Sequence, residues 1–151
     1  MNEGFIAVVA ALIGAASAWA VSRHQASAAH DQWLRQVRRE VYAGFLATAR
    51  DEMERTFGEV SARSAFTRLT AREWASAGEE MFEAACKIDR AAEAMKLEAP
   101  ENLASAVDDF RAEVWLMATS SDVEEFRVSY GEVSHELTRI AALCKTSLQT
   151  T

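Results

Sequence analysis

The chain has 151 residues, 50% of them hydrophobic, and it contains a single proline and six glycines. This length leaves room for one soluble domain besides an apolar N-terminal segment, and the scarcity of chain-breaking residues favours long helices over sheets. The formal net charge is −7: residues 1–39 hold four basic and two acidic groups, and residues 40–151 hold twelve basic and twenty-one acidic groups. A body this acidic repels phosphate backbones, which argues against a nucleic-acid partner.

Residues 4–22 form the first predicted element, an uncharged run with the sequence GFIAVVAALIGAASAWAVS. A helix of this length spans about 28 Å, close to the ~30 Å hydrocarbon core of a bilayer. Glu3 precedes the run, and Trp19 and Arg23 lie at its other end. We therefore predict a transmembrane helix and assign residues 1–24 to a membrane anchor.

Two other interpretations of this run remain open. One is a cleaved signal peptide with Ala26-Ser27-Ala28 as its cleavage motif, although the chain lacks the basic start that is typical of such peptides. The other is a helix buried in a soluble protein, although uninterrupted apolar stretches of this length are uncommon there.

Four arginines follow the apolar run: Arg23, Arg35, Arg38 and Arg39. Because positive residues close to a span are retained on the cytoplasmic side, they predict an N-terminus outside and a cytoplasmic body. The predicted location is therefore the cell inner membrane, crossed once. The same arginines have two further roles open to them, which are attraction of anionic lipid headgroups and ion pairing with neighbouring helices.

Small residues share one face of the predicted span: Ala10, Gly14 and Ala18. Such a row lets two helix backbones approach closely in lipid, which favours self-association through the span. An alanine-rich run also produces this pattern by chance, so both interpretations stay open.

The second predicted helix covers about residues 31–57. Apolar residues recur in it at every fourth position: Trp33, Val37, Val41, Phe45, Ala49, Met53 and Phe57. This broad apolar face suits packing, and we expect Gly58 to end the helix as its C-cap. Trp33 is expected in the core of the folded body, the alternative being an anchor at the membrane interface.

The remainder of the chain predicts three more helices, at about 71–98, 100–119 and 122–147. Thr70 and Glu73 fit a capping box before the first of them, and Pro100 is expected as the first residue of the second. In each helix the apolar residues recur at alternating intervals of three and four residues and so form one stripe along the helix, which we call its seam. This is the spacing of helices that pack as in coiled coils. We therefore predict an all-α fold in which residues 25–151 form an antiparallel up-and-down bundle of about four helices.

Two stretches carry a family resemblance when they are taken with the N-terminal span: QWLRQVRREVYAGFLATA at 32–49 and MKLEAPENLASAVDDF at 95–110. In this combination the chain resembles uncharacterised bacterial small single-span membrane proteins with a cytoplasmic helical bundle. The resemblance covers most of the chain and implies that architecture, but it implies no activity. Such proteins often have a glycine before the proline, where this chain has Glu98-Ala99-Pro100.

No catalytic signature is found, because the sequence contains no nucleophile elbow, P-loop or dinucleotide-binding motif. Glu132 and His135 form a Glu-x-x-His element of the kind used by di-iron bundles, but no second copy accompanies it, and the seam places both on the outer face. Cys86 and Cys144 have no metal-ligand spacing and are expected to be small buried thiols. We therefore predict no enzymatic activity, no metal site and no cofactor.

Residues 58–70 form a predicted polar connector with local positive charge from Arg63, Arg68 and the nearby Arg72. As the least regular part of the body, it is a candidate loop for binding a partner. The alternative is a solvated linker whose charges lie at helix ends.

These patterns together predict a non-enzymatic, membrane-tethered helical scaffold or interaction module that acts through protein–protein contacts. Its expected partners are the lipid bilayer and either further copies of itself, as a homo-oligomer, or another membrane protein. Two alternatives remain open. One is a small membrane-active effector or pore former of the holin or defence-effector type, and the other is a sensor that binds a ligand in a pocket of the bundle.

Overall fold

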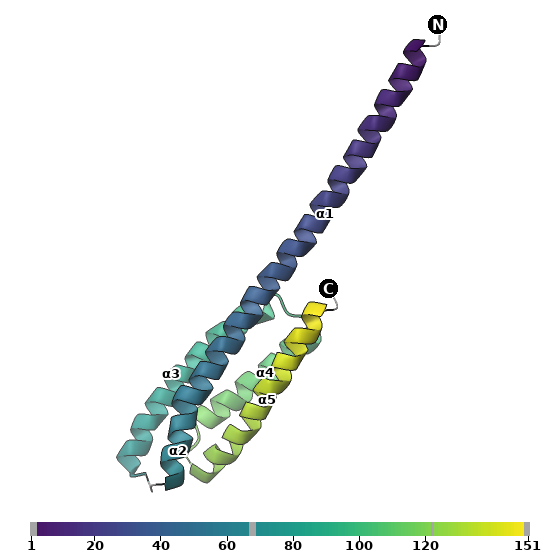
Figure 1. Cartoon of the computed structure of the whole chain (residues 1–151). Helices are drawn as coiled ribbons and strands as arrows, with labels where there is room; N and C mark the ends of the chain where they lie inside the picture. Colours follow the sequence, from purple (N-terminus) through teal and green to yellow (C-terminus); the bar gives the residue numbers. More distant parts are fainter. Residues whose placement is uncertain (1–2, 67–68, 122, 150–151) are drawn as a thin grey trace. The chain divides into compact units, whose positions relative to one another are not determined.

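The computed structural model of the chain (Figure 1) describes residues 3–66, 69–121 and 123–149, excluding the side chains of residues 3–21, 24, 65 and 66. Six helical elements follow one another in these ranges: α1 (Glu3–Glu52), the π-helix η1 (Met53–Gly58), α2 (Glu59–Phe66), α3 (Ala71–Lys96), α4 (Glu101–Ala118) and α5 (Val123–Gln149). The described residues contain no strand, so the predicted all-α class is confirmed. The chain divides into two compact units, Met1–Val37 and Arg38–Thr151, and we describe each by itself.

The first unit contains the N-terminal part of α1. The predicted span at residues 4–22 falls here, and all of its side chains except that of Ser22 lie outside the described part of the structure. Within the described part of the chain, no helix is both long and apolar enough to cross a bilayer.

Trp33 lies in the first unit and is exposed to solvent over 58% of its surface. Its ring stacks on that of His30, with 5.9 Å between the centroids. The prediction that Trp33 lies in the core is therefore wrong. Four residues of an α-helix turn about 40° more than one full turn. Trp33 lies three such intervals before the buried Phe45, so its direction differs by about 120° from the face that enters the core.

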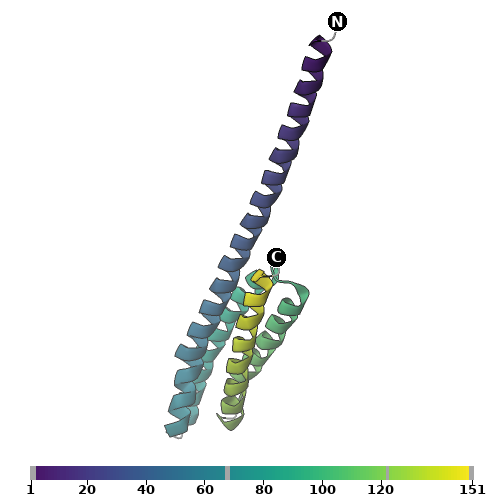
Figure 2. The ribbon, with the colours of Figure 1, turned by 45° about the vertical axis from the view of Figure 1, so that its right-hand side comes forward.

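The second unit is a four-helix bundle. Its first member is a helical stretch that we call the N-terminal column, which consists of residues 38–52 of α1 followed by η1 and α2. The column packs against α3 and α5, and α4 lies between those two helices (Figures 1 and 2). Consecutive helices run in opposite directions, so the unit is an antiparallel up-and-down bundle.

The core of the bundle is apolar and follows the three-and-four spacing. From α4 it takes Leu103, Val107, Phe110, Val114 and Met117. The end of the bundle near α2 is filled by neighbouring aromatic rings, those of Phe57, Trp74, Phe126 and Tyr130, whose centroids lie between 5.8 and 6.5 Å apart in the contacting pairs. Full burial of one large apolar side chain stabilises a fold by about 1.5–3 kcal/mol, so this core supplies most of the driving force for folding.

The starts of α3 and α4 differ in how they are capped. The Glu73 N–H donates to Thr70 Oγ1 at 3.3 Å and the Thr70 N–H donates to Glu73 Oε2 at 2.8 Å, so the predicted capping box is confirmed. The Thr70 hydroxyl, which donates to Glu73 Oε2 at 2.7 Å, and the Thr70 N–H hold the pKa of Glu73 below its usual value. Pro100 is the N-cap of α4 and not its first residue, and its carbonyl accepts the N–H groups of Leu103 and Ala104 at 2.9 Å.

The helix predicted at 31–57 is part of a longer helical stretch, because α1 begins at Glu3 and helical geometry continues through η1 and α2 to Phe66. Gly58 is consequently not a C-cap, and no described glycine has a positive φ. The four-residue spacing explains the difference. The wider turn of a π-helix compensates for the rotation that such steps cause on an α-helix, so Met53 and Phe57 both stay in the core and the chain has no reason to turn at Gly58.

The other three helices begin and end within two residues of their predicted limits: α3 against 71–98, α4 against 100–119 and α5 against 122–147. The predicted connector at 58–70 is different, because most of it is the helix α2. Val60 is fully buried and fastens this segment to the core, which is why it is ordered as a helix.

Candidate functional site

An exposed aromatic pair lies on the outer surface of α3 and α4. Phe82 is exposed over 53% of its surface, and its ring meets that of Trp115 edge-on, with 5.2 Å between the centroids. Trp115 is half-buried and donates its indole N–H to Asp89 Oδ1 at 3.4 Å. The half-buried Cys86 lies one turn beyond Phe82 on α3. Bulky apolar side chains held in a fixed geometry at the surface are typical of protein-binding sites.

Ion pairs continue the same surface beyond the aromatic pair. Arg111 donates from Nε and Nη2 to Asp89 Oδ1, at 2.9 and 2.7 Å, and from Nη1 to Asp108 at 3.1 Å. Lys96 Nζ lies 2.8 Å from Asp108. Burial raises the pKa of Asp89, but hydrogen bonds from Arg111 and Trp115 outweigh it and hold the pKa below its usual value. Because Asp89 binds both Arg111 and Trp115, the ion pairs also fix the indole ring of the aromatic pair.

The two helices that carry the aromatic pair are also the acidic part of the bundle. Together α3 and α4 have ten acidic and five basic side chains. Residues 38–66, by contrast, hold five of each, and α5 holds four acidic and three basic ones. Three of the five basic side chains on α3 and α4 are already in ion pairs with carboxylates, namely Lys87, Lys96 and Arg111. The two helices together therefore carry more negative than positive charge, although some of these carboxylates face neighbouring helices, as Glu80 does in its ion pair with Arg63.

A buried polar network lies where α1 meets η1. Glu52 is only 5% exposed, and its Oε2 accepts from Arg55 Nη2 at 2.8 Å and from Thr56 Oγ1 at 3.3 Å. Lys87, from α3, places Nζ 3.2 Å from Glu52 Oε1. Burial raises the pKa of Glu52, but the hydrogen bonds and charges of Lys87 and Arg55 outweigh burial and bring the pKa below 4.5. The network therefore joins the N-terminal column to α3 through a charged carboxylate.

The network does not resemble a metal centre. Within the described residues, no group of three or more histidine, cysteine or acidic side chains is placed to hold a metal ion. Each oxygen of Glu52 instead has a cationic partner, so we interpret the site as structural.

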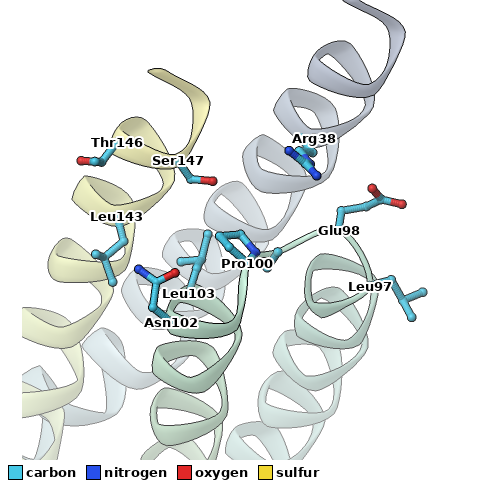
Figure 3. A pocket seen from close by; sticks show the side chains of 10 residues that line it. Arg38, Leu97, Glu98, Pro100, Asn102, Leu103, Leu143, Thr146 and Ser147 are labelled. Carbon is cyan, nitrogen blue, oxygen red and sulfur yellow. The ribbon is translucent and has the colours of Figure 1, made fainter. Parts of the chain in front are cut away.

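A pocket of about 480 Å³ lies beside the turn between α3 and α4 (Figure 3). Arg38 faces it from α1, Asn102 from the first turn of α4 and Ser147 from α5. The hydroxyl of the buried Tyr42 donates to the carbonyl of Glu98 at 3.3 Å and lies 3.5 Å from Ser147 Oγ, so it ties two of the pocket walls together. The pocket lining thus combines the guanidinium group of Arg38 and the carboxylate residue Glu98 with neutral polar groups and an apolar wall.

The four predicted membrane-proximal arginines are divided between the two units. Arg23 and Arg35 belong to the first unit, and Arg38 and Arg39 belong to the second. Arg39 is exposed and Arg38 lines the pocket. Their roles in topology and headgroup attraction stay predictions.

The three arginines of the predicted partner loop do not share a loop. Arg63 lies in α2 and forms an ion pair with Glu80 at 3.6 Å. Arg72 is exposed in the first turn of α3, and Arg68 lies outside the described residues. The prediction of a connector loop is therefore wrong where Arg63 is concerned, because that residue belongs to a packed helix.

The remaining predicted residues have mixed outcomes. The side chains of Ala10, Gly14 and Ala18 lie outside the described part of the structure. Glu132 and His135 are exposed, as the seam of α5 predicts.

The two cysteines differ. Cys144 is buried, and burial raises its pKa to about 11. Cys86 is only half-buried, so the prediction of two buried thiols is right for one of them. Cys86 directly follows the buried seam residue Ala85 on α3 and therefore faces partly outward.

Sequence reasoning missed the aromatic pair, although a signal for it exists. Phe82 directly follows the seam residue Met81, and Trp115 directly follows Val114. Of these two residues off the seam, Phe82 stays exposed and Trp115 packs partly against the core. A bulky apolar residue beside a well-defined seam therefore indicates a second contact surface, at the core's edge or outside it.

Comparison of the chain with protein families, with curated proteins and with solved structures finds no match. The site is accordingly interpreted from its own geometry.

Proposed function

We propose that the protein is a membrane-tethered, non-enzymatic helical interaction module. In this proposal the N-terminal span holds the bundle at the inner membrane, and the bundle binds other proteins. The single observation that supports this function best is the edge-on contact between the exposed Phe82 and the half-buried Trp115 on the outer side of α3 and α4.

The membrane part of the proposal rests on the sequence. Residues 4–22 carry no charge, and the arginines that follow favour a cytoplasmic body below a single span with its N-terminus outside. The resemblance to bacterial single-span proteins with a cytoplasmic bundle agrees with this arrangement. The row of Ala10, Gly14 and Ala18 further supports a homo-oligomer that assembles through the span.

The interaction part rests on the second unit. Its core accounts for the folding of the bundle without Phe82, because the seam residues of α3, α4 and α5 are buried among themselves and Trp115 packs partly against them. The phenyl ring of Phe82 therefore adds little to folding and is available for a contact with another protein.

Site-directed labelling tests the orientation. Cys144 is unsuitable as a reporter because burial raises its pKa to about 11, so a cysteine at the exposed position 94 (Ala94→Cys) is the better choice, in a Cys86→Ser background. A membrane-impermeant maleimide is expected to label it only after the inner membrane is opened. Labelling in spheroplasts with an intact inner membrane would contradict the proposed orientation.

The pocket beside the α3–α4 turn supports a second candidate function, that of a small-ligand sensor. Arg38, the one basic residue in the lining, suits a small carboxylate or inorganic phosphate, which would bind on the side of the pocket away from the acidic Glu98. A thermal melt of the full chain in the presence of each anion measures this. A rise in Tm that disappears in Arg38→Met supports the sensor, and an unchanged Tm for every anion argues against it.

A further inference from the structure

We propose that the outer α3–α4 surface around Phe82 and Trp115 docks a basic amphipathic segment of a partner protein. An apolar side chain of that segment packs on the aromatic pair, and lysine or arginine side chains on either side of it face the acidic groups of α3 and α4. The inference rests on the proposed function, since it names the chemistry of the partner that the interaction module binds.

The apolar anchor is already in its bound geometry. The edge-on contact between Phe82 and Trp115 and the bond from the Trp115 indole to Asp89 hold both rings before a partner arrives. Little side-chain freedom is therefore lost on binding, which favours affinity for a small contact. Aromatic residues in such fixed positions are the commonest anchors of protein interfaces.

The charge around the anchor selects the partner. Glu79 lies one turn before Phe82 on α3 and is exposed, and Glu83, next to Phe82, is exposed as well but shares its charge with Lys87, 3.3 Å away. On the two helices as a whole acidic side chains outnumber basic ones by ten to five. A second copy of the chain would bring an equally acidic surface against this one and be repelled, whereas a basic segment is attracted.

Gly78 gives an independent reason to expect a close approach. It lies in the interior of α3, four residues before Phe82, where glycine costs about 1 kcal/mol relative to alanine. A Cβ added at this position would meet nothing within 4 Å, so packing inside the described residues does not require the glycine. With no side chain at Gly78, the backbone of a segment bound beside Phe82 can come closer to α3 than it could at any other residue type.

Photo-crosslinking in cells tests the inference on the full chain. Phe82 is replaced by p-benzoylphenylalanine, which keeps an aromatic ring at the anchor, and the crosslinked peptides are identified by mass spectrometry. The matched control carries the same group at Val128, an equally apolar position on α5 that is 63% exposed. We expect the position-82 probe, and not the control, to capture a segment in which apolar residues alternate with lysine or arginine.

Two further substitutions, each combined with the position-82 probe, test separately how the charge at Glu79 and the missing side chain at Gly78 affect the crosslinking yield. Glu79→Lys is expected to lower the crosslinking yield about fivefold through charge reversal, while Glu132→Lys on α5 leaves the yield unchanged. Gly78→Ala is expected to lower the yield by placing a methyl group between α3 and the bound segment, while Gly131→Ala on α5, where a Cβ also meets nothing, does not.

Several outcomes would overturn the inference: capture of this chain's own peptides, of an acidic or uncharged segment, of the same peptides from both probes, or of nothing. These outcomes are distinguishable from a failure of the proposed function. The distribution of the protein between membrane and soluble fractions, measured on the same samples, reports the tether separately.

Discussion

The N-terminal column and the three helices that follow it solve the same packing problem in different ways. In α3, α4 and α5 the buried positions are almost all apolar and alternate steps of three and four. In the column the apolar residues recur every fourth position, a π-helix interrupts the α-helix, and the bundle's two buried polar residues, Glu52 and Thr56, lie at that interruption. The contrast shows how a helix keeps one face in a core when its sequence does not follow the α-helical period.

The difference also sets where the structure tolerates change. Where the seam fits the helical period, truncation of one seam side chain removes only the contacts that this side chain makes. The column in addition depends on a close fit at Gly58 and on a compensated buried charge at Glu52. The following predictions sharpen this contrast, in order from the largest expected change in the free energy of unfolding to the smallest.

Removal of a core ring from the regular region is expected to have the largest effect. Phe110 is fully buried and meets Phe45 edge-on, with 6.0 Å between the ring centroids. Phe110→Ala should lower the free energy of unfolding by about 3–5 kcal/mol through lost burial and the cavity left behind. Chemical denaturation of the full chain measures this, and Phe82→Ala, at the exposed surface, is the matched control. Equal losses for the two variants would contradict the assignment of inside and outside.

Loss of the charge of Glu52 is expected to come next. Glu52→Gln leaves Lys87 and Arg55 facing a neutral amide in a buried site, at a cost of about 1–3 kcal/mol. Because the pKa of Glu52 in the folded protein lies below its ordinary 4.5, its contribution is present above that pH and is lost as the pH falls through the folded value. Stability measured between neutral and acidic pH should therefore fall less in Glu52→Gln than in the unmodified chain. The exposed Glu132→Gln is the control, and parallel pH profiles for all three proteins would contradict the role given to Glu52.

A methyl group at Gly58 is expected to destabilise the column. The added Cβ would lie 3.1 Å from the hydroxyl of Tyr130 and 3.3 Å from the carbonyl of Met53. Gly58→Ala should therefore cost about 1 kcal/mol, since overpacking outweighs the better helix propensity of alanine. Adding Tyr130→Phe to Gly58→Ala removes the nearer contact and should restore part of the lost free energy of unfolding. The double variant should therefore be more stable than the sum of the two single changes predicts. Simple additivity of the two changes would show that the contact does not constrain the helix.

The smallest expected effect is a gain. Gly131 lies inside α5 with nothing within 4 Å of an added Cβ, so Gly131→Ala should raise the free energy of unfolding by about 0.5–1 kcal/mol. A shift of Tm to higher temperature in the same melts that are used for Gly58→Ala reports it. A destabilised Gly131→Ala would mean that this surface of α5 is more crowded than the structure shows.

The same contrast explains what the sequence alone could predict. Where the seam matched the helical period, it placed α3, α4 and α5 within two residues and put residues such as Ile88 and Phe110 in the core. Where the apolar residues recur every fourth position, the sequence predicts a regular helix with Trp33 in the core and Gly58 as its C-cap, and both predictions are wrong. The local sequence alone does not predict a π-helix, because the π-helix depends on the packing of Met53 and Phe57 in the core of the folded bundle.

The candidate site was predictable only in part. The arginines that follow the apolar run were found by their charge and position, but Arg63 was assigned to a loop because the burial of Val60 is a tertiary fact. Phe82 and Trp115 were passed over because each stands next to a seam residue. The seam predicts that Met81 and Val114 face the core, and only the packed bundle shows that the rings of Phe82 and Trp115 meet each other.

Flotation of the full chain tests the central claim most directly. The protein, expressed in cells and released without detergent, is mixed into a dense sucrose layer, overlaid and centrifuged with its native membranes. We predict that it rises with the membranes and stays with them after alkaline carbonate extraction, and that a variant with aspartate at Val9 and Leu12 remains in the dense layer as a folded helical bundle. Unmodified protein that remains in the dense layer would contradict the account.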